Sequence, residues 1–326
     1  MIRIYSYGQV PASEIFSRQE SRTDVSAAVA AIIAAVRQEG DTALRRYAKE
    51  FDKAELTEIE VPAAQLDAAV DALDGELRAI LQEAAERIRA FHSRQVRNSF
   101  VLPQEGGVLL GQRVIPLDRV GLYIPGGTAA YPSSVLMNCI PAKIAGCREI
   151  GMVSPPSRGG DIDPVILAAA RIAGVDRVFR TGGAQAVAAL AYGTETIPRV
   201  DKIVGPGNAY VAEAKRQVFG QVAIDMIAGP SEILVLADAK SDARVVAADL
   251  LSQAEHDKMA SAVLVTDSGD LALAVQAELE RQLPLLPRAE IARASIDDNG
   301  KIIVAENLAQ AVDIANEIAP EHLELC

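Results

Sequence analysis

Short β-rich segments alternate with alanine-rich helical segments over most of the chain after residue 118, and this alternation limits the possible folds more than any other feature. Strands separated by helices of this length are expected to pair in parallel through right-handed crossovers. The predicted strands cover residues 119–124, 150–153, 177–180, 202–204, 232–237, 261–266 and 302–305. The predicted helices cover residues 133–146, 164–173, 184–192, 209–218, 242–255, 270–282 and 308–318.

The first hundred residues have a helical pattern instead. An apolar stripe over residues 25–36 ends at Gly40, Asp41 is expected to cap the next helix, and an amphipathic run covers residues 63–99. We therefore predict an α/β fold of two incomplete Rossmann-like units with parallel sheets, the second inserted in the first, plus a helical N-terminal region. The expected division is an arm (1–19), a first domain (20–118 and 230–326) and a second, nucleotide-facing domain (119–229).

Composition argues against several classes of partner. The chain has 32 basic and 44 acidic residues and a net charge of −12, which repels nucleic-acid backbones and anionic lipids. Its longest apolar run, residues 27–36, is far shorter than the roughly 20 residues of a membrane-spanning helix. The N-terminus does not resemble a secretory signal, and three cysteines do not make a disulfide framework. We expect a cytoplasmic protein without nucleic-acid or membrane partners.

Glycine turns follow three of the predicted strands, at residues 121–128 (GLYIPGGT), 182–185 (GGAQ) and 205–208 (GPGN). A helix is predicted after each turn, and its first N–H groups can bind an anion such as phosphate. Asn208 is expected to cap its helix. Because ligands bind at the carboxyl ends of strands in open parallel sheets, the turns together predict a nucleotide crevice. None has the G-x-G-x-x-G spacing, so tight turns without a ligand are the alternative.

Two pairs of polar residues are candidates for chemistry. Gln253 and His256 project from one face of a predicted helix; histidine is a common metal ligand but glutamine a poor one, so a hydrogen-bonded helix end is the alternative. Glu321 and His322 follow Pro320 at a helix-to-strand corner, where they could act as two bases. Neighbouring side chains on an extended chain point to opposite faces, so this requires a bend. An ordinary surface corner is the alternative.

Cys139 and Cys147 allow a different mechanism, the oxidation of an aldehyde through a cysteine thioester, as in aldehyde dehydrogenases. Both lie in or just after an apolar helical segment without a neighbouring base in the sequence. Buried small apolar side chains are the alternative interpretation.

Six segments, taken together, resemble histidinol dehydrogenase. They occur in order over about 200 residues, and the N-terminal helical pattern extends the resemblance to the whole chain. The segments are 120–138 (VGLYIPGGTAAYPSSVLMN), 182–186 (GGAQA), 205–208 (GPGN), 228–232 (AGPSE), 253–256 (QAEH) and 319–322 (APEH).

The resemblance implies a zinc-containing, NAD-dependent homodimer that oxidises L-histidinol through histidinaldehyde to L-histidine, the last steps of histidine biosynthesis. It implies that His322 takes the alcohol proton and that Glu321 activates the water that hydrates the aldehyde. No cysteine is needed for this chemistry. The implied zinc ligands are Gln253 and His256, which also contact the substrate together with Ser231 and His322. The implied NAD-binding residues are Tyr123, Gln185 and Asn208.

Family members continue for roughly another hundred residues, which carry two further zinc ligands (an aspartate and a histidine), a substrate-contacting histidine and a segment that reaches across the homodimer. The sequence as given is therefore expected to be C-terminally truncated. Two zinc ligands do not complete a site, so we expect weak zinc binding and impaired activity. The alternative is a non-catalytic fold that binds NAD or a partner subunit.

Overall fold

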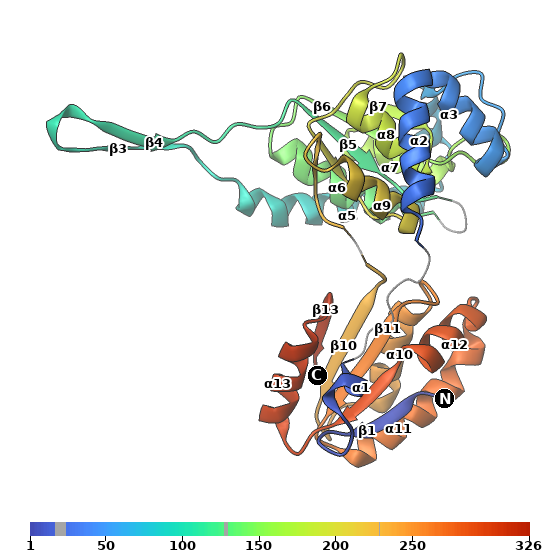
Figure 1. Ribbon diagram of the computed structural model, residues 1–326, viewed down its shortest axis with the longest axis vertical. Helices are drawn as coiled ribbons and strands as arrows, with labels where there is room; N and C mark the ends of the chain where they lie inside the picture. The colour runs from blue at the N-terminus through green and yellow to red at the C-terminus, as the bar shows by residue number, and fades with distance from the viewer. Residues whose placement is uncertain (17–23, 127–129, 228) are drawn as a thin grey trace. The chain divides into compact units, whose positions relative to one another are not determined.

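The chain divides into two compact units in the computed structural model, which describes residues 1–16, 24–126, 130–227 and 229–326. One unit consists of Met1–Thr23 and Gly229–Cys326, and the other of Asp24–Ala228. We call them the split unit and the inserted unit, because the second lies within the sequence of the first (Figure 1).

The inserted unit is built on a sheet that has six strands among the described residues, in the order β2–β7–β6–β5–β8–β9. All neighbouring strands are parallel except β2, which runs antiparallel to β7. The central strands are buried, as is typical of parallel sheets covered by helices on both faces. The strands are β2 (Glu60–Val61), β5 (Arg119–Tyr123), β6 (Glu149–Ser154), β7 (Arg177–Arg180), β8 (Lys202–Val204) and β9 (Ala223–Ile224).

Two layers of helices cover this sheet. α2, α3, α8 and α9 share a hydrophobic cluster with Tyr123, whereas α4 to α7 share another with Leu122. Adjacent strand residues point to opposite faces, so the two clusters lie on the two faces of the sheet; Figure 1 shows α2 beside α8. The helices are α2 (Ser26–Glu39), α3 (Asp41–Tyr47), α4 (Ala63–Asp71), α5 (Gly75–His92), α6 (Pro132–Ile144), α7 (Pro164–Ala173), α8 (Gly183–Tyr192) and α9 (Ala209–Val218).

This packing corrects the expected domain division, which joined residues 20–118 to residues 230–326. The helices of residues 24–118 instead cover the sheet of the inserted unit. The physical reason is α8, whose residues 184–191 are all buried. A helix that is apolar on every side needs a further helix over its outer face, and the apolar stripe of α2 supplies it. The expected end of the arm, at residue 19, lies outside the described residues.

The amphipathic run 63–99 forms two helices instead of one. Asp74 separates them, because its Oδ1 accepts a hydrogen bond of 2.9 Å from the Glu76 N–H and so caps α5. After a short 3-10 turn, η2 (Ser93–Gln95), the strands β3 (Phe100–Pro103) and β4 (Leu109–Gln112) form an antiparallel hairpin around a second such turn, η3 (Glu105–Gly107). The sequence patterns did not predict this hairpin, which extends away from the helices of its unit (Figure 1).

The split unit contains a parallel sheet with the order β1–β12–β11–β10–β13 among the described residues. Residues 1–19 were expected to form an arm, but β1 pairs with β12 and places Ile4 opposite Ile302. β1 is as short as β7, but it stands outside the strand–helix alternation that indicated the other short strands. The strands are β1 (Arg3–Ser6), β10 (Glu232–Ala237), β11 (Ser261–Thr266), β12 (Lys301–Val304) and β13 (His322–Leu325).

Helices cover both faces of this second sheet. One cluster joins α10, α11 and α12 to one face, and another joins α13 and Ile15 to the opposite face. The helices are α1 (Ala12–Ile15), α10 (Ala243–Ala254), α11 (Gly269–Gln282), α12 (Ala289–Asp298) and α13 (Leu308–Ile318), with a 3-10 turn at η4 (Leu283–Leu285). Within the described part of the chain, no helix combines the length and the apolar character needed to cross a membrane.

The predicted α/β alternation is confirmed, and several predicted helices and strands have the observed bounds, among them residues 164–173, 261–266 and 308–318. Asp41 is an exception, because Gly40 and not Asp41 is the N-cap of α3. The Asp41 carboxylate is buried and accepts a hydrogen bond of 3.3 Å from the Thr196 N–H. It therefore ties α3 to the loop after α8 instead of capping its own helix.

Candidate functional site

A cavity of about 960 Å³ opens at the carboxyl ends of the parallel strands of the inserted unit; we call it the α8 cavity. Tyr123 is the last residue of β5, Gln185 lies in the first turn of α8, and Asn208 directly precedes α9. All three line this cavity. The glycine turns after β5, β7 and β8 thus meet at one edge of the sheet, as expected for parallel strands. Gly127 and Thr128 of the first turn lie outside the described residues.

Tyr123 and Gln185 form the buried wall of the α8 cavity. The Tyr123 hydroxyl oxygen accepts a hydrogen bond of 2.9 Å from the Gly183 N–H at the start of α8. Burial raises the pKa of Tyr123 to about 12, so its hydroxyl stays protonated at neutral pH. Gln185 is only 2% exposed, and no donor among the described residues reaches its Oε1 atom. An unpaired buried acceptor is costly, so its presence beside a cavity indicates a ligand that donates a hydrogen bond.

Polar contacts also hold the turn after β8 in place. Asn208 caps α9 as predicted, because its Oδ1 accepts hydrogen bonds from the N–H groups of Tyr210 (3.0 Å) and Val211 (3.2 Å). The Asn208 side-chain amide N–H₂ remains available to a ligand. Buried Lys215 pairs with Asp225 and donates a hydrogen bond of 3.0 Å to the Gly205 carbonyl.

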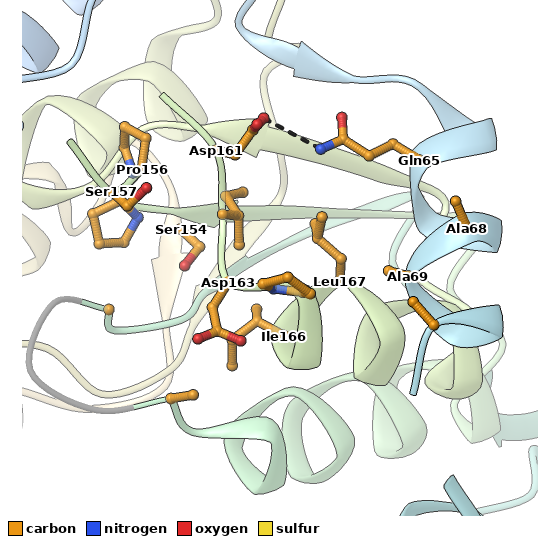
Figure 2. A pocket seen from close by; sticks show the side chains of 16 residues that line it. Gln65, Ala68, Ala69, Ser154, Pro156, Ser157, Asp161, Asp163, Ile166 and Leu167 are labelled. Carbon is orange, nitrogen blue, oxygen red and sulfur yellow. Dashed lines mark hydrogen bonds between the residues drawn. The ribbon is translucent and has the colours of Figure 1, made fainter. Parts of the chain in front are cut away.

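A second cavity, of about 710 Å³, lies near the start of α7 and shares Gly126, Pro155, Pro156 and Ser157 with the first. Figure 2 shows Gln65 of α4 and Asp161 facing each other across its edge, joined by a hydrogen bond of 3.2 Å. Asp163 caps α7 by accepting a hydrogen bond from the Val165 N–H. The carboxylates here have protein partners, so among its described lining residues this cavity has no unpaired buried acceptor like that of the α8 cavity.

In the split unit, Ser231, Glu321 and His322 lie at the amino-terminal edge of the strands. The Glu232 carbonyl oxygen is 3.0 Å from His322 Nδ1, and the Glu232 N–H donates a bond of 3.4 Å to Glu321 Oε2. The Ser231 carbonyl oxygen accepts a bond of 2.9 Å from the Ser261 N–H across the same edge. Ala228, which precedes this segment, lies outside the described residues.

The chain bends at Glu321, which is the geometry that the predicted pair of bases needs. Ala319 ends α13 in the left-handed region (φ 47°), Glu321 lies in a bend, and His322 begins β13. As a result, Glu321 Oε2 and His322 Nδ1 lie 3.7 Å apart, although the residues are adjacent in the sequence. Both side chains are about half exposed and open to a substrate. A strained residue just before such a pair is typical of functional corners.

Gln253 and His256 are arranged differently from the prediction. α10 ends at Ala254, so Gln253 lies in its last turn whereas His256 lies in the turn beyond it. α10 leads back to the start of β11, which places both residues at the amino-terminal edge of the sheet. Within the residues that the structure describes, no group of three or more histidine, cysteine, aspartate or glutamate side chains could hold a metal ion. These two side chains alone do not complete a zinc site.

The cysteines do not suit nucleophilic catalysis. Cys139 is buried in α6, and burial raises the pKa of its thiol to about 12. Burial also raises the pKa of the half-buried Cys147 thiol. Because the thiolate is the reactive form, both side chains fit the interpretation as small packing residues.

A family model for histidinol dehydrogenase matches residues 16–326. The chain belongs to the histidinol dehydrogenase family. It is 57% identical over 298 residues to the family member of Geobacillus kaustophilus, a match that covers 91% of this chain and 70% of that protein. It is 58% identical over 303 residues to the member of Syntrophotalea carbinolica, covering 92% and 70%.

A solved structure agrees with this assignment. The crystal structure of histidinol dehydrogenase from Elizabethkingia anophelis matches this chain with a TM-score of 0.94 and 39% sequence identity. The match covers 99% of this chain and 75% of that chain. An NAD-dependent benzaldehyde dehydrogenase from Corynebacterium glutamicum has a TM-score of 0.50 at 13% identity, covering 92% of this chain and 85% of that one. The latter likeness concerns the fold alone.

Several residues of the α8 cavity were not singled out from the sequence. Phe51, Asp52 and Arg158 line it, and they come from loops and turns outside every motif of the family resemblance. The signal that could have indicated them is weak, because an Asp after an aromatic residue near a helix end is common in protein sequences. Their relevance depends on burial and proximity, which only the structure shows.

Proposed function

We propose that this protein oxidises L-histidinol through histidinaldehyde to L-histidine with NAD, in the last steps of histidine biosynthesis. The observation that carries the proposal is the 3.7 Å approach of Glu321 Oε2 to His322 Nδ1 at a bent corner, in a chain that belongs to the histidinol dehydrogenase family. These two residues are the proposed catalytic bases. The substrate class follows from the names of the relatives.

The α8 cavity fits NAD, which would supply the hydride acceptor for both oxidations. Its volume lies within the range of ligand pockets, and the unpaired Gln185 Oε1 can accept a hydrogen bond from the nucleotide. The proposed NAD-binding residues are Tyr123, Gln185 and Asn208. The Gly183 N–H already donates to the Tyr123 hydroxyl, so the next N–H groups of the first turn of α8, where Ala184 and Gln185 line the cavity, would bind a phosphate.

His322 has the hydrogen bond that a general base needs. Its Nδ1 atom lies 3.0 Å from the Glu232 carbonyl oxygen, which can only accept, so Nδ1 carries the proton. Nε2 is then the basic atom, and it takes the alcohol proton while the carbinol carbon loses a hydride. Glu321 accepts a proton from the water that adds to the aldehyde and returns it to the former carbonyl oxygen, which gives the hydrate. The hydrate then loses a hydroxyl proton to His322, after His322 has released the first proton to solvent, and its carbon loses the second hydride. Each oxidation thus releases one proton and one hydride.

Gln253 and His256 are the proposed zinc ligands in this chain, and the bound metal would orient the substrate. Two ligands, one of them an amide, are fewer than the four that zinc usually has, so the residues described do not close the site and no step above depends on zinc. Ser231, Gln253, His256 and His322 are the proposed contacts of L-histidinol.

The same proposal includes a homodimer and a cytoplasmic location. The β3–β4 hairpin exposes apolar side chains on both faces, including Val101 (63% exposed), Leu109 (68%) and Leu110 (56%). A two-stranded hairpin of this kind is unstable in water unless something covers it. A second copy of the chain is the proposed partner that covers the hairpin. The Leu109→Glu variant is expected to sediment as a monomer, and a dimeric variant would refute this role.

The three free cysteines suit a reducing compartment, in agreement with the proposed cytoplasmic location.

NADH formation with L-histidinol tests the function, using protein expressed from the complete reading frame with zinc supplied. Two NADH per histidinol are expected. His322→Gln is expected to lower kcat for both oxidations by roughly 10²- to 10⁴-fold, because the alcohol and the hydrate both lose a proton. Glu321→Gln should slow chiefly the oxidation of added histidinaldehyde.

Two substitutions serve as controls. Asp313 is an exposed acid on α13, the helix that precedes the corner, and Asp313→Asn is expected to leave turnover unchanged. Cys147→Ala should also turn over at close to the parent rate. A folded but inactive Cys147→Ala variant would favour the cysteine mechanism instead, and full activity of His322→Gln would refute the proposed base.

A further inference from the structure

The chain has an unusual turn beside the α8 cavity. α3 continues into a π-helical turn, η1 (Ala48–Asp52), which ends at Lys53 in the left-handed region with φ 59°. Lys53 and Ala319 are the two non-glycine residues with positive φ in the described part of the chain, and Ala319 precedes the proposed catalytic corner. π-helical turns are rare and occur frequently at functional sites. The rare conformation makes this turn a candidate functional element.

Phe51 presents an open aromatic face to the cavity. Its ring stacks on Tyr47 with a centroid distance of 5.3 Å and an interplanar angle of 6°, so one face is held by the protein. The side chain is 51% exposed and lines the cavity. A ring fixed on one face and open on the other is a stacking surface for a flat base.

Asp52 presents a carboxylate without a partner. Its Oδ2 atom is buried, and no hydrogen-bond donor among the described residues reaches it. Neighbouring Lys53 is not paired with it in the structure; its ammonium group donates to the Glu50 carbonyl oxygen at 2.6 Å. Burial raises the pKa of the Asp52 carboxyl to about 6, as expected for a carboxylate that lacks a compensating charge. A ligand in the cavity can supply the missing donors.

We propose that η1 binds the adenosine half of NAD, with the Phe51 ring stacked on adenine and the Asp52 carboxylate accepting hydrogen bonds from the ribose hydroxyls, and that Asp52 makes the cavity reject NADP. This inference rests on the proposed function. The adenine takes no part in hydride transfer, so it can lie against the half-exposed ring at the rim. In dinucleotide-binding sites generally, an acidic residue on the ribose 2′-hydroxyl selects NAD, because it repels a 2′-phosphate.

Arg158 is the group that could weaken this selection. It lines the same cavity and is exposed. An arginine close to the ribose would accommodate a 2′-phosphate, whereas an arginine on the pyrophosphate would bind both cofactors alike. The Asp52 carboxylate, whose Oδ2 atom is buried, is expected to outweigh the exposed Arg158 cation, because interactions of partly buried charges are screened less by solvent.

Calorimetric titration with NAD and with NADP, without L-histidinol, tests the inference. The parent protein is expected to bind NAD roughly a hundredfold more tightly than NADP. Asp52→Asn should reduce this ratio to about tenfold or less, mainly by gaining affinity for NADP. Phe51→Ala should weaken both nucleotides by a similar factor, roughly tenfold or more, because it removes a stacking surface common to both.

Glu50→Gln is the matched control. Glu50 is an exposed acid on the same turn and does not line the cavity, so the variant should keep the parent ratio. An unchanged ratio in Asp52→Asn, or an equal change in Glu50→Gln, would overturn the inference while leaving NAD binding intact. Failure of the parent to bind either nucleotide would overturn the proposed function and the inference with it.

Discussion

At the scale of single residues, the ionised Asp52 carboxylate lowers the free energy of unfolding while it serves its proposed role in the cavity. Burial raises the pKa of its carboxyl from 3.8 to about 6. Its contribution to stability is therefore fully present below pH 3.8 and is lost as the pH rises through about 6. Asp52→Asn cannot ionise, so we expect it to raise the free energy of unfolding by about 1 kcal/mol near pH 7.5, after allowing for solvent screening of this partly buried group.

Urea denaturation at two pH values measures this effect. The gain of Asp52→Asn should shrink well below 1 kcal/mol near pH 4.5, where the folded parent is already largely protonated. A pH-independent gain would mean that the substitution acts through packing instead of charge. A variant that is more stable but less selective between cofactors is the result expected for a functional residue held at a cost.

The sequence indicated some residues of the proposed sites and not others, for physical reasons. Tyr123, Gln185 and Asn208 follow predicted strands, so the parallel topology alone brings them to one edge of the sheet. Glu321 and His322 were recognisable as a pair, but only the bend after Ala319 shows that their side chains approach each other. Asp52 was missed because its burial depends on a π-helical turn, and no short-range pattern predicts that turn.

At the scale of elements, Gly205 joins β8 to the cavity in a conformation that only glycine adopts easily. Its φ is 118°, and an added Cβ would lie 2.1 Å from the Tyr123 carbonyl oxygen. Gly205→Ala is expected to lower the free energy of unfolding by about 3 kcal/mol or more, from strain plus the clash with β5. It should also weaken NAD binding, because the clash displaces Tyr123. Chemical denaturation and calorimetry measure the two effects.

Gly220→Ala separates backbone strain from the clash. Gly220 has a φ of 97° in the same unit, but an added Cβ would meet nothing within 4 Å. We expect a loss of about 1 kcal/mol and unchanged NAD affinity. Equal losses in the two variants would show that the close approach of β8 to Tyr123 is unimportant.

Elements with regular apolar patterns could be predicted from the sequence, and those without could not. β11 and α13 have long, uninterrupted patterns and match their predicted bounds. β1 did not stand out because this short strand lies outside the strand–helix alternation of the later chain. The β3–β4 hairpin did not stand out because it exposes apolar side chains on both faces instead of alternating. The helix end at Ala254 was placed one residue late, and this put His256 closer to the helix than it lies.

At the scale of the whole molecule, the sequence predicts that one α/β unit is inserted in the other, but not which helices pack on the sheet of the inserted unit. Local patterns show that residues 26–39 form an amphipathic helix, whereas the sheet that this helix covers is a non-local property. The fully buried α8 contained the relevant signal, since an all-apolar helix requires cover on every side. Residues 24–118 thus belong to the inserted unit, whose sheet has β5 and β6 as its central strands.

This grouping makes a prediction about a fragment. Residues 24–228 form a continuous chain with both hydrophobic clusters of the inserted unit and every lining residue of the α8 cavity. Expressed alone, they are expected to unfold cooperatively on heating, followed by circular dichroism, and NAD should raise the melting temperature. At a hundred times its Kd, NAD would add about 2.7 kcal/mol to the free energy of unfolding. The same fragment with Gln185→Ala should melt cooperatively, but NAD should raise its melting temperature less.

A fragment that starts at residue 119, the domain boundary expected from the sequence, should not fold, because α8 would lose its contact with α2. Cooperative melting of that shorter fragment would refute the assignment of residues 24–118 to the inserted unit.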